Sequence, residues 1–161
     1  MKKLILSVLT IGLFGCGNEP KQQEVVASAP TMQNTMSNDE AKKFAENLYE
    51  KIKTEENTAR TAYKNNDKTK MTELESGLQT YILGDGQNKG YWIDDPALDP
   101  YTKCDTAIRD LYIYVGAMKM ELMKHTKSLK AITNQEEQDY LKSKAKCENL
   151  VVLSYDEASQ Q

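Results

Sequence analysis

Apolar side chains recur at helical spacing through most of the chain after residue 36. Between residues 38 and 64 they return every three or four positions, which places them on one face of an amphipathic helix. From residue 104 onward the spacing alternates between four and three, as in the narrow seam of a bundle helix. No strand-like alternation extends beyond a few residues. The pattern predicts an all-α fold, a small bundle of about four helices, over residues 38–64, 68–83, 100–131 and 134–152.

Residues that favour helix termini support three of these boundaries. Ser37 is followed three positions later by Glu40, which forms a capping box. Asp99 and Pro100 supply an N-cap and a proline at the first helical position. A second capping box, at residues 133–136, predicts that the fourth helix begins there.

Residues 84–100 interrupt the helical pattern. They contain three of the eight glycines, two of the four prolines and the single tryptophan, Trp92. Loops of this length are usually either functional or disordered. Aromatic side chains here lie beside carboxylates, a combination typical of binding hot spots with a charged rim. The sequence predicts a partner-binding surface at Tyr91, Trp92, Asp94, Asp95, Asp99 and Tyr101. The alternative is that Trp92 belongs to the core and closes one end of the bundle.

The first sixteen residues are organised as an export signal. Lys2 and Lys3 precede about a dozen mostly apolar residues, and this run ends at Cys16. The run is shorter than the ~20 residues that a membrane-spanning helix needs. Residues 13–16, Leu-Phe-Gly-Cys, resemble the lipobox of bacterial lipoproteins, in which the cysteine is acylated and becomes the new N-terminus. The alternative is an ordinary signal peptide that ends in cysteine.

The resemblance implies a location and a division of the chain. Cys16 would carry fatty-acyl chains such as palmitate, which attach the protein to a membrane. Gly17, in place of aspartate, implies sorting to the outer membrane of a Gram-negative cell, with the domain on its periplasmic face. The expected parts are a signal peptide (1–15), a lipidated, polar and disordered tether (16–36), a helical domain (37–153) and a polar tail (154–161).

An even pair of cysteines outside the lipobox predicts one disulfide, between Cys104 and Cys147. A straight third helix would place Cys104 roughly 40 Å from the next turn, and Cys147 only about 20 Å from it. The two Cα atoms must approach within about 7 Å. Either the third helix breaks, at Gly116 or at residues 125–128, or the turn lies nearer 125–127, or the cysteines are unpaired. A break with the bond formed is favoured.

Composition argues against nucleic-acid binding and gives no catalytic motif. Removal of residues 1–15 would leave 19 Lys+Arg against 24 Asp+Glu, a formal charge of −5, which suits a basic partner rather than phosphates. The single histidine, His125, rules out a multi-histidine metal site. Nucleophile and phosphate-loop motifs are absent. We therefore expect no enzyme, metal or cofactor, although paired carboxylates cannot be recognised from a sequence.

Helix 3 carries further candidates with ordinary interpretations. His125 is expected to be structural, and the methionines at 118, 120 and 123 to fill the helix. Four lysines share one helix face, which predicts a solvated surface or, alternatively, contact with an acidic partner or anionic head groups: Lys119, Lys124, Lys127 and Lys130.

These features predict a lipid-anchored periplasmic binding protein without catalytic activity. Small, acidic, disulfide-bonded helical lipoproteins resemble the immunity proteins that neutralise toxins in the periplasm. This likeness concerns architecture and location only. The alternatives are a structural or accessory subunit of an envelope assembly and a small-ligand carrier.

Overall fold

The structure is a computed structural model, and it describes residues 36–161. The predicted signal peptide, the predicted lipidation site Cys16 and the predicted tether as far as residue 35 lie outside the described residues. The described part belongs to one compact unit, Gln33–Gln161. The prediction of an all-α bundle with one disulfide is confirmed. The helices are α1 (Asn38–Lys64), α2 (Lys68–Leu83), the 3-10 helix η1 (Pro96–Tyr101), α3 (Thr102–Lys124), α4 (Lys127–Val151) and α5 (Tyr155–Ala158).

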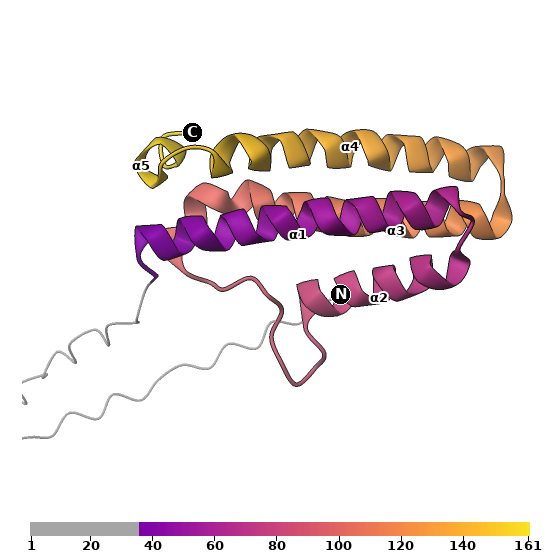
Figure 1. The fold of residues 1–161 in the computed structure, drawn as a ribbon, viewed down its shortest axis with the longest axis horizontal. Coiled ribbons are helices and arrows are strands. Elements are labelled where there is room, and N and C mark those ends of the chain that lie inside the picture. The colour runs from indigo at the N-terminus through magenta and orange to yellow at the C-terminus, as the bar shows by residue number, and fades with distance from the viewer. Residues whose placement is uncertain (1–35) are drawn as a thin grey trace, which may run out of the picture. The chain divides into compact units, whose positions relative to one another are not determined.

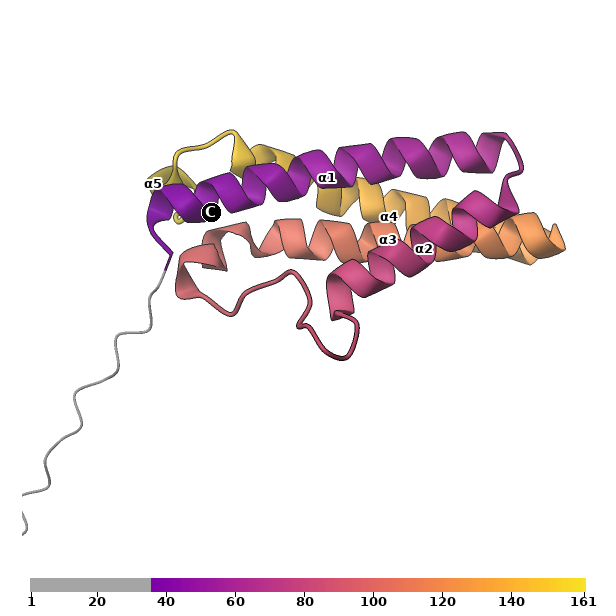
Figure 2. The ribbon, with the colours of Figure 1, turned by 60° about the horizontal axis from the view of Figure 1, so that its bottom comes forward.

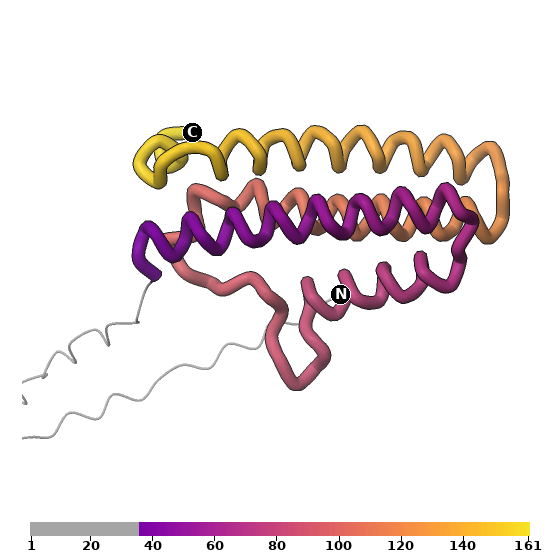
Figure 3. Tube along the Cα trace, in the orientation of Figure 1, coloured from indigo at the N-terminus to yellow at the C-terminus, as the bar shows by residue number. Residues whose placement is uncertain are grey.

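Three long helices, α1, α3 and α4, lie side by side, and α2 packs against α1 and α3 (Figures 1 and 2). With 16 residues against the 27 of α1, α2 is only about 24 Å long. The connection from α2 to η1 covers the remaining distance along the bundle (Figure 3). This connecting loop therefore lies where a full-length fourth helix would continue, and it contains most of the residues of the predicted binding surface. Within residues 36–161 no helix is both long and apolar enough to span a bilayer.

The core follows the two apolar seams that the sequence predicts. Alanines on α1 are buried and let the neighbouring helices approach closely. α1 also buries Leu48 and Ile52, and α3 supplies further large side chains, each of which stabilises the fold by about 2 kcal/mol when fully buried. Its seam residues are all buried: Cys104, Ile108, Leu111, Val115, Met118 and Leu122.

The turn between α3 and α4 lies at His125 and Thr126. This is the alternative in which the turn lies nearer 125–127, one of those that would allow the cysteines to pair. His125 adopts a left-handed conformation (φ 45°), and its N–H donates to the Glu121 carbonyl at 2.8 Å. Thr126 is the N-cap of α4, where its hydroxyl accepts a hydrogen bond from the Leu129 N–H at 3.2 Å. Gly116, the other suggested breaking point, lies inside an uninterrupted helix.

The helix start predicted at residues 133–136 is wrong. Thr133 is buried within α4, and its hydroxyl donates to the carbonyl of Leu129 at 3.0 Å. A threonine and a glutamate three apart match a capping box equally well inside a helix. A turn at His125 and Thr126, rather than at 132–133, brings Cys104 to the same level as Cys147.

The earlier turn also explains the disulfide. Cys104 lies 21 residues before His125, and Cys147 lies 21 residues after Thr126. Each stretch of 21 helical residues is about 31 Å long. Because the two helices are antiparallel, Cys147 returns to the level of Cys104 along the bundle. The two Cα atoms are 4.6 Å apart, and the Cys104–Cys147 bond is present.

Residues 154–161 are not merely a polar tail. Ser154 and Glu157 form a capping box that begins the single turn of α5. Ala158 is buried, and the Tyr155 ring packs edge-on against Tyr101, with centroids 6.2 Å apart. A four-residue helix contains too few apolar positions to show a period, so the pattern predicted none.

Candidate functional site

The loop after α2 begins with a tight turn that requires two glycines. Gly84 has φ 83°, and a Cβ there would lie 1.9 Å from the Asn88 carbonyl oxygen. A Cβ on Gly90 would lie 1.9 Å from the Ile82 carbonyl oxygen. The Asp85 carboxylate accepts a hydrogen bond from the Asn88 N–H at 2.7 Å. These contacts direct the residues that follow back toward the bundle.

Four aromatic rings hold the loop against α1 and α2. Tyr91 stacks on Tyr81 with ring centroids 4.5 Å apart. Phe44 meets the Trp92 ring edge-on at 5.8 Å, and Tyr91 meets it at 6.0 Å. All four rings are half-buried, and each such pair stabilises the fold by about 1 kcal/mol beyond its area. Trp92 thus packs on the bundle while part of its ring stays in contact with solvent.

Tyr91 is further constrained by a hydrogen bond to α3. Its hydroxyl donates to the Asp105 carboxylate at 2.6 Å, and Arg109 donates to the same carboxylate at 2.9 Å. Burial, together with the hydrogen bond to Asp105, raises the pKa of Tyr91 well above its usual range. Tyr91 therefore joins the loop to α3 and does not present a free hydroxyl to a partner.

Asp95 has a structural role as well. Its carboxylate accepts hydrogen bonds from the Ala97 N–H at 2.9 Å and from the Met36 N–H at 2.7 Å. It thereby caps η1 and ties the segment before α1 to the loop. A short polar side chain before a proline is typical of such a cap.

Tyr101 does not belong to a surface. The residue is 0% exposed, and its hydroxyl has no hydrogen-bond partner among the described residues. Burial and the neighbouring Tyr155 raise its pKa. The prediction that Tyr101 takes part in a partner-binding surface is therefore corrected, because α5 covers the ring. Asp94 and Asp99 are exposed and remain candidates together with Trp92.

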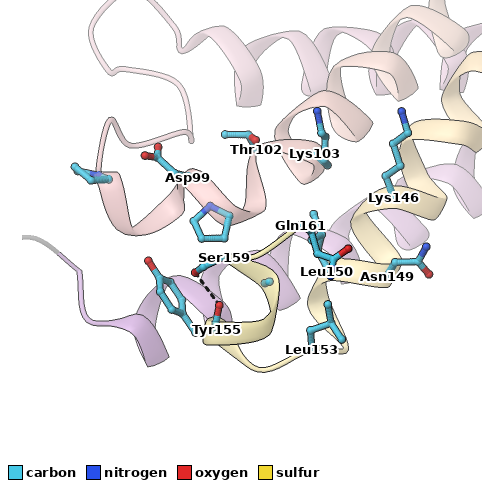
Figure 4. Close-up of a pocket in the computed structure, with 13 residues that line it drawn as sticks. Asp99, Thr102, Lys103, Lys146, Asn149, Leu150, Leu153, Tyr155, Ser159 and Gln161 are labelled. Carbon is cyan, nitrogen blue, oxygen red and sulfur yellow. Dashed lines mark hydrogen bonds between the residues drawn. The ribbon is translucent and has the colours of Figure 1, made fainter.

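A pocket of about 650 Å³ opens beside this segment, where η1 and the start of α3 meet the end of α4 and α5 (Figure 4). This volume is in the range of small-ligand sites. Figure 4 shows Lys103 and Lys146 at one edge and Leu153 and Tyr155 at the other. The lining residues are Pro96, Asp99, Pro100, Thr102, Lys103, Lys146, Asn149, Leu150, Leu153, Tyr155, Ala158, Ser159 and Gln161.

The disulfide fixes the wall of this pocket. Lys103 directly precedes Cys104 and Lys146 directly precedes Cys147, so the covalent bond sets the separation of the two lysines. Within residues 36–161 neither ammonium group forms an ion pair. Sequence reasoning missed this pocket because it depends on α5 folding back. The capping box at Ser154 was the one local signal for it.

The most buried carboxylate, that of Glu56 on α1, has a structural role. It accepts hydrogen bonds from Lys144 at 2.6 Å, Tyr140 at 2.8 Å and Arg60 at 2.9 Å. Burial alone would raise its pKa, but the bonds from Lys144, Arg60 and Tyr140 outweigh burial and lower it. An ionised carboxylate with three donors links α1 to α4 and is a poor general base.

The remaining candidates of helix 3 lie apart from the pocket. His125 forms the exposed turn after α3, and Lys119 pairs with Glu75 of α2. Met118 is buried, whereas the methionines at 120 and 123 are exposed. No cluster of histidine, cysteine and carboxylate side chains within residues 36–161 could hold a metal ion.

The chain matches no protein-family model, no curated protein and no solved structure. Its residues and their arrangement therefore provide the argument for function.

Proposed function

We propose that the protein is a lipid-anchored binding protein of the periplasm that acts without catalysis, as an immunity-type inhibitor of a basic protein partner. The proposal rests on the distribution of charge at one end of the bundle. The start of α1, η1 and α5 lie together there (Figure 1). Residues 37–46, 94–99 and 154–161 of this acidic end hold eight carboxylates and two lysines, and Lys103 and Lys146 at the pocket bring the lysines to four.

An acidic surface accelerates the encounter with a basic protein and selects against acidic ones. Asp94 and Asp99 are exposed on this end, and the pocket beside Asp99 offers apolar walls at Leu153 and Tyr155. A side chain of the partner could fill this recess, as anchor residues do in protein interfaces. The lipobox resemblance at Cys16 supports the membrane attachment.

The test is affinity capture from periplasm, followed by mass spectrometry, with wild type and Asp94→Asn/Asp99→Asn compared. We expect a basic protein that wild type retains and the double variant loses. Glu136→Gln/Asp139→Asn on α4 removes the same charge elsewhere and serves as the matched control. Capture of the same proteins by all three would refute binding through the acidic end.

A small-ligand carrier is a second candidate, favoured by the volume of the pocket. Native mass spectrometry of protein purified from periplasm would then show the chain with an added small molecule. A mass equal to that of the processed chain alone would count against a tightly held ligand.

A further inference from the structure

The end of the bundle opposite η1 and α5 has the reverse charge. The α1–α2 turn and the α3–α4 turn both lie there (Figures 1 and 2). We name residues 64–70 and 120–135 the basic end. Its acidic residues are Asp67 and Glu121, and its lysines are Lys64, Lys68, Lys70, Lys124, Lys127 and Lys130.

The charges of the basic end are not neutralised locally. Lys70 pairs with Glu73 at 3.3 Å, and both side chains are exposed. Within residues 36–161 the other five lysines form no ion pair. The Asp67 carboxylate accepts a hydrogen bond from the Lys70 N–H at 2.9 Å and caps α2. The basic end therefore presents a positive potential although the chain as a whole is acidic.

Large apolar side chains accompany these lysines. Met120 is 46% exposed, Met123 is 50% exposed and Ile132 is 48% exposed. They lie in the last turns of α3 and the first turns of α4, on either side of His125 and Thr126. An acidic protein or a nucleic acid would be attracted by the lysines alone. Exposed apolar side chains beside lysines suit a surface that enters the head-group region of a bilayer.

We propose that the basic end docks on a lipid bilayer that contains anionic head groups. Each lysine near such a surface strengthens binding about fivefold, and salt weakens this attraction within a Debye length of about 8 Å. Lysine stems follow the apolar boundary while the ammonium groups reach the phosphates. The proposal uses other residues than the acidic end and does not depend on the partner proposed above.

Docking would add a second attachment to acylation at Cys16. Acyl chains together with a basic patch hold more firmly than either signal alone. It would also orient the domain, because the acidic end lies at the far end of α1, about 40 Å away along a 27-residue helix. The basic end would face lipid, and the acidic end would face the periplasmic space.

The experiment uses the compact unit, residues 33–161, which contains the described core and the disulfide and lacks Cys16. A cooperative melt by circular dichroism first verifies that it folds. The probe is sedimentation with vesicles in which about a third of the lipid is phosphatidylglycerol, against vesicles of phosphatidylcholine alone. We expect binding to the anionic vesicles only, and its loss as salt rises from about 0.05 M to about 0.5 M.

The variants test the position of the charge. Lys124→Gln/Lys127→Gln/Lys130→Gln should lower the vesicle partition coefficient about 100-fold. The matched control, in which Gln replaces three exposed lysines outside the basic end, should leave it nearly unchanged: Lys43, Lys89 and Lys142. All six side chains are exposed, so folding should be preserved.

A third variant tests the apolar contribution. Met120→Ser/Met123→Ser should weaken binding to anionic vesicles about tenfold. Equal loss in both lysine triples would mean that net charge alone acts and would overturn the proposal. Failure to bind anionic vesicles, with retention on immobilised polyglutamate, would instead assign the basic end to an acidic macromolecule and also overturn it.

Discussion

Removal of the disulfide provides a quantitative test of the α3–α4 hairpin. In Cys104→Ala/Cys147→Ala the folded state keeps the turn at His125 and the packing of both helices, so the main change is in the unfolded chain. The bond joins residues separated by 43 positions. In the chain-entropy description, release of such a loop costs about 4 kcal/mol of unfolding free energy at 25 °C.

This free energy corresponds to a large change in melting temperature. A domain of this size has an unfolding entropy near 0.26 kcal/mol per kelvin, so a loss of about 4 kcal/mol lowers the Tm by roughly 15 °C. The assay is thermal unfolding followed by circular dichroism, for the oxidised protein, the reduced protein and the double variant. The reduced protein and the variant should agree within a few degrees.

The loss should also have a local component. Cys104 and Cys147 lie at the ends of the helices remote from the turn, beside Lys103 and Lys146. Hydrogen exchange should therefore accelerate most in the first turns of α3 and the last turns of α4. A variant with unchanged Tm, or native protein with two free thiols, would refute the pairing and with it the equal-length hairpin.

The remaining predictions concern single side chains. Glu56→Gln should lower the stability at pH 7 by about 2 kcal/mol, because charged hydrogen bonds to Lys144 and Arg60 are lost. The folded pKa of Glu56 lies below its ordinary value of 4.5, so the stabilisation by its carboxylate is complete above pH 4.5 and disappears as the pH falls through the folded pKa. The unfolding free energies of wild type and Glu56→Gln, measured by urea titration, should therefore converge in acid. A difference that stays constant with pH would contradict the lowered pKa. Trp92→Ala should cost about 2 kcal/mol, less than the 3–5 kcal/mol of a fully buried aromatic, because the ring is half-buried; a full core-sized loss with unchanged partner affinity would assign Trp92 to the scaffold. Cys16→Ser should abolish metabolic incorporation of a fatty-acid analogue, and equal labelling of wild type and variant would exclude acylation at this position.

The first two helices could be predicted to the residue, because the information is local. An apolar period of 3.6 defines each buried face, and Ser37 with Glu40 forms the capping box that starts α1. The loop between α2 and η1 was recognisable for the same reason, since glycines and prolines interrupt the period. The seam of α3 and the choice of cysteine partners also followed from spacing and number alone.

Contacts between distant segments decided the rest. The local pattern favours Thr133 as the start of α4, because Glu136 completes a capping box there. The alignment of Cys104 with Cys147, however, requires the start at Thr126. Tyr101 and Trp92 are both aromatic residues beside carboxylates, yet α5 covers one and leaves the other partly open. The pocket, the acidic end and the basic end each combine residues from two or more segments that are distant in the sequence. The sequence determines which side chains are charged, apolar or aromatic. Which of these side chains come close together depends on helix length, turn position and packing, and no local pattern specifies these.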